Sequence, residues 1–327
     1  MATLAAPDIQ IDSFLEEGSL DSMAADIRAG LERRPKELPP KYFYDARGSE
    51  LFDRITEQPE YYPTRCERAI LNRHAPTIVE LTGARELVEL GSGSASKTRA
   101  LLYAMAGAGT LERYVPVDVS EAVVERSALE LCELYPGLRV HGLVGDFERH
   151  LPHLPAGEHR LFAFLGGTFG NHFPEQRATF LASLRELFGS GDFLLLGTDL
   201  RKDPAVLEAA YNDAAGVTAE FNRNVLRNVN TALGGDFEPE AFEHRAVFDP
   251  DASRIEMRLV ARAEQHVRIA AAGIEVHFAD GEEMLTEIST KFTPEGLEEE
   301  LRTAGLGLEA LFTDEDGLFA VSLARPL

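Results

Sequence analysis

One stretch indicates the fold: Val88-Glu89-Leu90-Gly91-Ser92-Gly93-Ser94-Ala95-Ser96-Lys97-Thr98. Its apolar start, its glycines and its polar end predict a strand, a tight turn and the beginning of a helix. Glycines let the backbone approach a ligand closely, and the N-terminus of a helix favours the negative end of that ligand. The stretch therefore predicts a ligand site at the carboxyl end of a strand.

Two acidic residues follow this stretch, each at the end of a further apolar run. Asp118 lies in Val117-Asp118-Val119, and Asp146 precedes Phe147. A carboxylate in the first position suits the two hydroxyls of a ribose. An Asp-Phe pair suits an adenine, because the carboxylate accepts from the exocyclic amine and the ring covers one face. Together they predict a nucleoside site at the carboxyl ends of parallel strands.

The glycine pattern helps to decide which nucleoside is bound. The fingerprint of NAD-binding proteins requires a third glycine where this chain has Ser96. The combination of Gly91, Gly93 and the later acidic residues instead looks like the S-adenosylmethionine (SAM) site of Rossmann-like methyltransferases. Those sites commonly carry an acidic residue two positions before the first glycine, as Glu89 is here. They often have a further glycine where this chain has Ser94.

Composition excludes several classes of function. The chain has 327 residues, of which 44% are hydrophobic, as is ordinary for a soluble globular protein. Its net charge is −23, from 32 basic and 55 acidic residues, and this opposes any partner made of phosphates. We therefore expect a small-molecule substrate and no nucleic-acid partner.

Location is indicated by the cysteines and by the apolar runs. Cys66 and Cys132 lie far apart, in neither disulfide nor metal-site spacing, which favours a reducing compartment. The N-terminus lacks the features of a signal peptide, and no apolar run approaches the roughly 18 residues of a membrane span. We expect a cytoplasmic protein with no membrane association, and a monomer.

Helices and strands are expected to alternate through the middle of the chain. The apolar stripe over 10–35 predicts an amphipathic helix, and 66–81 predicts another. Strands are expected at 86–90, 112–118, 138–144, 160–165 and 192–197, with helices at 95–107, 120–134 and 174–188 between them. Strands separated by helices predict a parallel sheet with right-handed crossovers.

This alternation breaks after residue 201. Residues 203–231 predict helices, and 241–290 alternate with period two, as antiparallel strands do. Two short strands, near 307–312 and 317–323, resemble the reversed final hairpin of a methyltransferase sheet. We expect an α/β fold: a Rossmann-like core (65–201 and 292–327) with a mostly parallel seven-stranded sheet, plus an inserted α+β substrate-binding domain (1–64 and 202–291).

The chain also resembles a specific family, the SAM-dependent histidine Nα-methyltransferases of ergothioneine biosynthesis, which form trimethylhistidine (hercynine). The resemblance covers roughly residues 35–325. It is carried by Leu38-Pro39-Pro40-Lys41-Tyr42-Phe43-Tyr44-Asp45, Pro59-Glu60-Tyr61-Tyr62-Pro63-Thr64-Arg65, residues 88–93, Leu165-Gly166-Gly167-Thr168-Phe169-Gly170-Asn171, residues 212–218, Phe221-Asn222-Arg223-Asn224 and residues 282–289.

The resemblance implies roles for the cofactor residues. Asp118 would bind the ribose diol, and Asp146 and Phe147 the adenine. The methionine half of SAM would be surrounded by Gly91, Lys97 and Gly166, with Lys97 near its carboxylate. The full set of expected cofactor residues is Glu89, Gly91, Gly93, Lys97, Asp118, Asp146, Phe147 and Gly166.

The resemblance also implies a substrate site for L-histidine. Asn171 and Tyr211 would hold the carboxylate, since an amide and a phenol both donate to an anion without titrating. Glu287 and Ser289 would bind the imidazole, and their i, i+2 spacing in a strand places both on one face. Further pocket residues would be Tyr44, Tyr61, Thr218 and Met257, the last as an apolar wall.

The reaction would be an in-line displacement by the neutral α-amine, in which most of the catalysis is positioning. The expected catalytic residues are Asn171, Tyr44 and Thr168, without a metal, since the methyl donor is already activated. No dedicated base is identified. Two alternatives remain: an N-methyltransferase of another amino acid, such as tryptophan or tyrosine, and a nucleotide-sensing module without turnover. Glu287 favours an imidazole over a larger carbon ring.

Overall fold

The computed structural model describes residues 7–14 and 19–327. These form two compact units. The first contains residues 7–14, Cys66–Leu200 and Phe292–Leu327, and the second contains residues 19–65 and Arg201–Lys291. Part of the helix expected over 10–35 falls on residues 15–18, outside the described residues.

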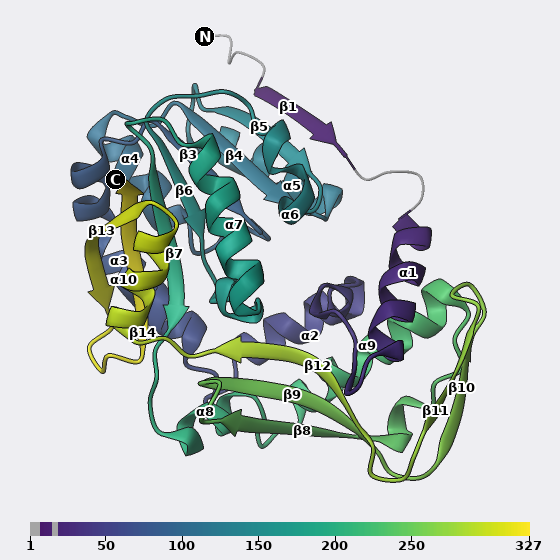
Figure 1. The fold of residues 1–327 in the computed structure, drawn as a ribbon. Helices are drawn as coiled ribbons and strands as arrows, with labels where there is room; N and C mark the ends of the chain where they lie inside the picture. Colours follow the sequence, from purple (N-terminus) through teal and green to yellow (C-terminus); the bar gives the residue numbers. More distant parts are fainter. Residues whose placement is uncertain (1–6, 15–18) are drawn as a thin grey trace. The chain divides into compact units, whose positions relative to one another are not determined.

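The first unit is built on one eight-stranded sheet (Figure 1). Its order is β1-β5-β4-β3-β6-β7-β14-β13, in which β14 runs antiparallel to both β7 and β13. The strands are β1 (Asp8–Ser13), β3 (Glu86–Leu90), β4 (Arg113–Asp118), β5 (Arg139–Val144), β6 (Arg160–Phe164), β7 (Phe193–Asp199), β13 (Leu306–Thr313) and β14 (Phe319–Pro326). This confirms the α/β fold with a reversed last hairpin.

Strand β1 corrects the expectation of a seven-stranded sheet. Residues 10–13 were expected to begin a helix of the second domain, but Asp8–Ser13 form a strand that pairs in parallel with β5, from Asp8 opposite Arg139 to Ser13 opposite Val144. The reason is a short alternation, in which Ile9 and Ile11 alternate with the polar residues Asp8, Gln10 and Asp12. That period-two run was too short to stand out beside the longer helical stripe that follows it.

Helices cover both faces of the large sheet. Leu87 and Val88, neighbours on β3, belong to different apolar clusters, as expected when successive side chains point to opposite faces. One cluster includes side chains from α3, α4 and α5, and the other from α7 and α10. The helices are α3 (Pro63–Thr82), α4 (Arg99–Ala108), α5 (Glu121–Leu134), α6 (Phe147–His150), α7 (Pro174–Leu187) and α10 (Pro294–Thr303).

The second unit contains a four-stranded sheet in the order β2-β12-β9-β8 and a separate two-stranded sheet, β10-β11. These strands are β2 (Lys36–Glu37), β8 (Phe242–Asp249), β9 (Arg254–Ala261), β10 (Gln265–Ile269), β11 (Ile274–Phe278) and β12 (Glu283–Thr290). Its helices are α1 (Ser19–Glu32), α2 (Ala46–Thr56), α8 (Pro204–Ala210) and α9 (Val217–Leu233). The period-two pattern over 241–290 thus corresponds to antiparallel pairs, β8 with β9 and β9 with β12.

One helix start differs from the sequence-based expectation. The helix α4 begins at Arg99 with Thr98 at its N-cap, not near residue 95. Ala95 has a left-handed backbone with φ of +53°, so the turn after Gly93 extends further than the glycines alone suggested. Within the described part of the chain, no helix is both long and apolar enough to cross a membrane.

Candidate active site

The glycine-rich turn after β3 forms an open cradle. Gly91 and Gly93 have φ values of +70° and +49°, a left-handed conformation that favours glycine. A Cβ added at either position would meet no atom within 4 Å. The backbone conformation, rather than crowding, therefore favours glycine here, and the space beside the turn is free for a ligand to approach.

Asp118 fixes this turn from the end of β4. Its Oδ2 accepts a hydrogen bond from the Gly93 N–H at 2.8 Å, and its Oδ1 accepts from the Ser120 N–H at 3.0 Å. The Gly145 N–H donates to the Asp118 carbonyl at 2.9 Å, which brings the end of β5 alongside. Asp146 and Phe147 follow directly, so the structure gathers these acidic strand ends as the sequence predicted.

The aromatic ring expected beside an adenine is anchored in the first unit. Phe147 is half-buried and meets the ring of Phe164 edge-on, with centroids 5.1 Å apart. Its ring is therefore held by the core while part of it stays accessible. The adenine contact itself remains a prediction.

Glu89 is held by two core residues. The hydroxyl of Tyr114 donates to its Oε2 at 2.5 Å, and the hydroxyl of Thr98 donates to its Oε1. Burial raises the pKa of Glu89 to about 7. The residue thus connects β3 with β4 and with the N-cap of α4. This supports the glycine turn, and direct contact with a cofactor remains a prediction.

Lys97 is paired with a residue that the sequence analysis missed. The Lys97 ammonium lies 2.5 Å from Oε2 of Glu67, a fully buried carboxylate in α3. Oε1 of Glu67 accepts from the Gly166 N–H at 2.7 Å. Glu67 therefore joins the two loops expected around the methionine half of the cofactor. A Cβ at Gly197 would lie 2.1 Å from this same oxygen, so glycine there makes room for the carboxylate.

The loop after β6 carries two of the expected catalytic residues. Thr168 and Asn171 are the first and last residues of a single 3₁₀ turn, which follows Gly167 with φ of +72°. The Thr168 hydroxyl donates to the carbonyl of Leu165 at 3.3 Å. Asn171 is half-buried. Both residues belong to the first unit, and their roles at the reacting atoms remain predictions.

The predicted imidazole-binding residues lie on β12 in the second unit. Glu287 is 8% and Ser289 is 4% exposed, and the register places Glu287 directly opposite Met257 on β9. Directly opposed residues have Cβ atoms about 4.5–5.5 Å apart. The structure therefore brings the predicted apolar wall next to the predicted carboxylate.

Glu287 is an unusual carboxylate. Burial raises its pKa to about 7, against an opposing effect of the Lys291 ammonium. A ligand N–H that donates to this buried carboxylate would offset part of the free-energy cost of its desolvation.

Ser289 contacts Tyr211 and a lysine that the sequence analysis missed. The Tyr211 and Ser289 hydroxyl oxygens are 2.7 Å apart. Lys291, which is 2% exposed, donates to Ser289 at 2.7 Å and to Tyr211 at 3.1 Å. Glu287 and Ser289 are alternate residues of β12, and Lys291 continues this spacing directly after the last residue of the strand, Thr290. The same period-two rule that paired the first two could have found the third.

An aromatic cluster surrounds the remaining predicted pocket residues. The rings of Tyr61 and Tyr211 have centroids 6.2 Å apart. The ring centroid of Tyr44 lies 5.6 Å from those of Phe52 and Phe221, two residues that were not expected in the pocket. Tyr44 is 42% exposed, so a ligand can reach it. Desolvation of its hydroxyl, followed by the charges of Glu287 and Tyr211, raises the pKa of Tyr44 above its ordinary value.

Thr218 is buried in the first turn of α9. Its N–H donates to Asp213 at 2.7 Å, and the neighbouring Val217 N–H donates to the same carboxylate at 2.9 Å. Asp213 thus caps this helix, as acidic residues often do at helix N-termini. The contact of Thr218 with a substrate stays a prediction.

Known proteins provide independent information about the chain. Residues 23–326 match a family described as histidine-specific, SAM-dependent methyltransferases. The chain is 52% identical over 308 residues to a histidine Nα-methyltransferase of Mycolicibacterium smegmatis, covering 94% of this chain and 96% of that one. It is 49% identical over 303 residues to the enzyme of that name from Mycobacterium tuberculosis, covering 93% and 94%.

A third relative is longer than this chain. It is the ergothioneine biosynthesis protein 1 of Neurospora crassa, 31% identical over 312 residues, which span 89% of this chain and 34% of that protein. The family match and the two bacterial relatives each extend over nearly the whole sequence and agree with the resemblance read from the motifs. The chain belongs to the histidine-specific, SAM-dependent methyltransferases.

Proposed function

We propose that this protein transfers three methyl groups in succession to the α-amino nitrogen of L-histidine. The product is trimethylhistidine (hercynine), and the reaction is the first step of ergothioneine biosynthesis. Beyond family membership, the observation that best supports this proposal is the arrangement of side chains on β12. Glu287 lies directly opposite Met257 on β9, and the Ser289 hydroxyl contacts the Tyr211 hydroxyl.

The first unit has residues that fit SAM. The open backbone at Gly91 and Gly93 and the Asp118 carboxylate beside it suit a nucleoside. Asp118 would hold the ribose, Asp146 and Phe147 the adenine. The loops joined by Glu67, those of Lys97 and Gly166, would surround the methionine end. When bound, SAM supplies a methyl group on a positively charged sulfur, which is already activated toward a neutral amine.

Glu287 supports histidine as the substrate. Its carboxylate can accept from an imidazole N–H, and the Ser289 hydroxyl can serve the other ring nitrogen. A site built to hydrogen-bond a polar group rejects analogues without that group by larger factors than an apolar pocket achieves. An indole or phenol ring would leave this buried carboxylate and hydroxyl poorly matched. This argues against tryptophan or tyrosine as the substrate.

We expect tyrosines of the second unit to contact the α-amino and α-carboxylate groups of the substrate. Tyr211 would donate to the substrate carboxylate, and Asn171 of the first unit is the second predicted donor. The raised pKa of Tyr44 keeps its hydroxyl protonated near neutral pH, so it is suited to hydrogen bonding rather than to acting as a resident base. Each transfer requires a neutral α-amine, and positioning of that amine is the main contribution of the protein.

A panel of amino acids tests the proposal. The pure protein is incubated with SAM and each of the twenty amino acids, and the products are weighed by mass spectrometry. We expect methylated product from histidine alone. Product from tryptophan or tyrosine would reassign the substrate, and cofactor binding without any product would favour a sensing module.

A further inference from the structure

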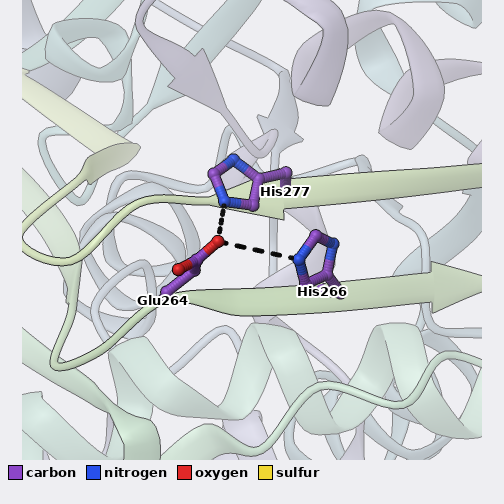
Figure 2. Close-up of side chains that lie close together, drawn as sticks. All are labelled: Glu264, His266 and His277. Atoms are coloured by element: carbon purple, nitrogen blue, oxygen red, sulfur yellow. Dashed lines mark hydrogen bonds and ion pairs between the residues drawn. The ribbon is translucent and has the colours of Figure 1, made fainter.

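A cluster of potential metal ligands lies on the β10-β11 sheet. His266 and His277 are direct cross-strand partners, and Glu264 lies two residues before His266 (Figure 2). Directly opposed residues of two paired strands point to the same face of the sheet, and Glu264 directly precedes the first residue of β10. The three side chains therefore gather on one face of this small sheet, and Figure 2 shows them converging.

The opposite face of the sheet anchors it. Val267, Ile269 and Phe278 are at most 2% exposed. On the outer face, by contrast, the side chains of His266, Glu264 and His277 are 78%, 68% and 49% exposed. The backbone carrying the three side chains is therefore fixed by packing, while the side chains themselves can rotate.

The donor atoms are close to the spacing that a metal requires. Oε1 of Glu264 lies 2.9 Å from Nε2 of His277 and 3.8 Å from Nε2 of His266, and one ligand atom from each residue lies within 4.8 Å of the others. Bonds of about 2.0–2.2 Å in a tetrahedral site set ligand atoms about 3.4 Å apart. Small rotations of exposed side chains can produce that spacing.

We infer that Glu264, His266 and His277 bind a divalent transition-metal ion such as Zn²⁺, with water completing its coordination. Two imidazoles and a carboxylate are ligands that Zn²⁺ prefers, whereas Mg²⁺ and Ca²⁺ prefer oxygen ligands alone. The net charge of −23 also favours a cation. Bound metal would cross-link the two strands. Methyl transfer does not use this site, which lies on a different sheet from β12.

Calorimetry with metal salts tests this inference. The full-length protein, freed of any polyhistidine tag and treated with a chelator that is then removed, is titrated with ZnCl₂ and separately with MgCl₂. We expect one equivalent of Zn²⁺ to bind, and Mg²⁺ to bind far more weakly. Glu264→Ala, His266→Ala and His277→Ala should each weaken Zn²⁺ binding by about tenfold or more.

Glu275→Ala provides a matched control. Glu275 lies on the same face of β11, two residues before His277, so its replacement removes the same charge as Glu264→Ala and leaves all three ligands. It should bind Zn²⁺ as the wild type does. No binding to wild type would overturn the inference. So would wild-type affinity in His277→Ala, which would place the metal elsewhere, or equal weakening by Glu275→Ala, which would indicate a general charge effect.

A thermal measurement checks the same site independently. Metal that binds only the folded protein raises the unfolding temperature. Zn²⁺ should raise the Tm of wild type and of Glu275→Ala, and should not raise that of His266→Ala. Equal stabilisation of all three proteins would contradict the assigned ligands. All variants should keep wild-type histidine methylation without added metal.

Discussion

The hydroxyl oxygens of Tyr211 and Ser289 lie 2.7 Å apart, although 78 residues separate them in the sequence. Lys291 donates to both oxygens. An ammonium group has donors only, so each hydroxyl oxygen must accept from it. One O–H is used between the two hydroxyls, and the ammonium occupies an acceptor position on each oxygen. Lys291 thus makes the Tyr211–Ser289 pair a weaker acceptor and better suited to donate to a carboxylate or an imidazole nitrogen.

Replacing Lys291 should therefore weaken histidine binding. Lys291→Met removes both charged hydrogen bonds, each worth about 1.5–3 kcal/mol, and we expect the KM for histidine to rise about tenfold or more. SAM affinity, measured by calorimetry, should stay at the wild-type value. Lys291→Arg should recover part of the loss, and Lys41→Met, at an exposed site, serves as the control. An unchanged KM in Lys291→Met would show that the hydroxyl pair does not depend on the lysine.

Asp118 should contribute strongly to SAM binding. Asp118→Ala loses a carboxylate beside the glycine turn, and we expect binding to weaken by about 1.5–3 kcal/mol, as for lost charged hydrogen bonds. Asp118→Asn keeps one oxygen that can accept from the Gly93 N–H but removes the charge. This variant therefore distinguishes the effect of the charge from the effect of the hydrogen bond that holds the turn. Calorimetric titration with SAM measures the difference, with Asp251→Ala as an exposed control. Unchanged affinity in Asp118→Ala would remove this residue from the site.

Glu287 should make stability depend on pH. Its folded-state pKa is raised from 4.5 to about 7, so the folded protein holds this proton more tightly than the unfolded chain does. The stability contributed by the group is present below pH 4.5 and is lost as pH rises through about 7. Glutamine does not titrate. The free energy of unfolding of Glu287→Gln, relative to that of wild type, should therefore rise between pH 4.5 and pH 8 by on the order of 3 kcal/mol.

Thermal unfolding at pH 5 and pH 8 measures this difference. The control is Glu275→Gln, an exposed carboxylate on β11. A constant difference between Glu287→Gln and wild type across this range would mean that the Glu287 carboxyl titrates normally in the folded protein.

The predicted site was recognisable where local pattern and chemistry coincide. The glycine turn with Asp118 follows from strand geometry. Glu287 and Ser289 were implied by the family resemblance, and strand geometry added that the two side chains share one face. Glu67 could not be predicted in this way, because it lies in a helix 24 residues before Gly91 and no local pattern marks it. Its role emerges only when folding brings α3 against the loops of Lys97 and Gly166. Strand β1 was missed because six residues of alternation are a weak signal.

Substrate choice should change when the Glu287–Met257 pair is altered. Glu287→Ala removes the acceptor for the imidazole, and Met257→Val enlarges the space directly opposite it on β9. The double variant should lose histidine turnover and accept a larger aromatic amino acid such as tryptophan. Competition assays with equal histidine and tryptophan measure the ratio of kcat/KM values. A double variant that still prefers histidine would show that the imidazole is recognised elsewhere.

The position and number of the transferred methyl groups test the central claim most directly. Histidine is incubated with the protein and SAM carrying a deuterated methyl group, and the product is fragmented in a tandem mass spectrometer. We predict three labelled methyl groups, all on the α-amino nitrogen, with mono- and dimethyl species appearing earlier in the time course. Label on an imidazole nitrogen, or the absence of any histidine product, would contradict the account.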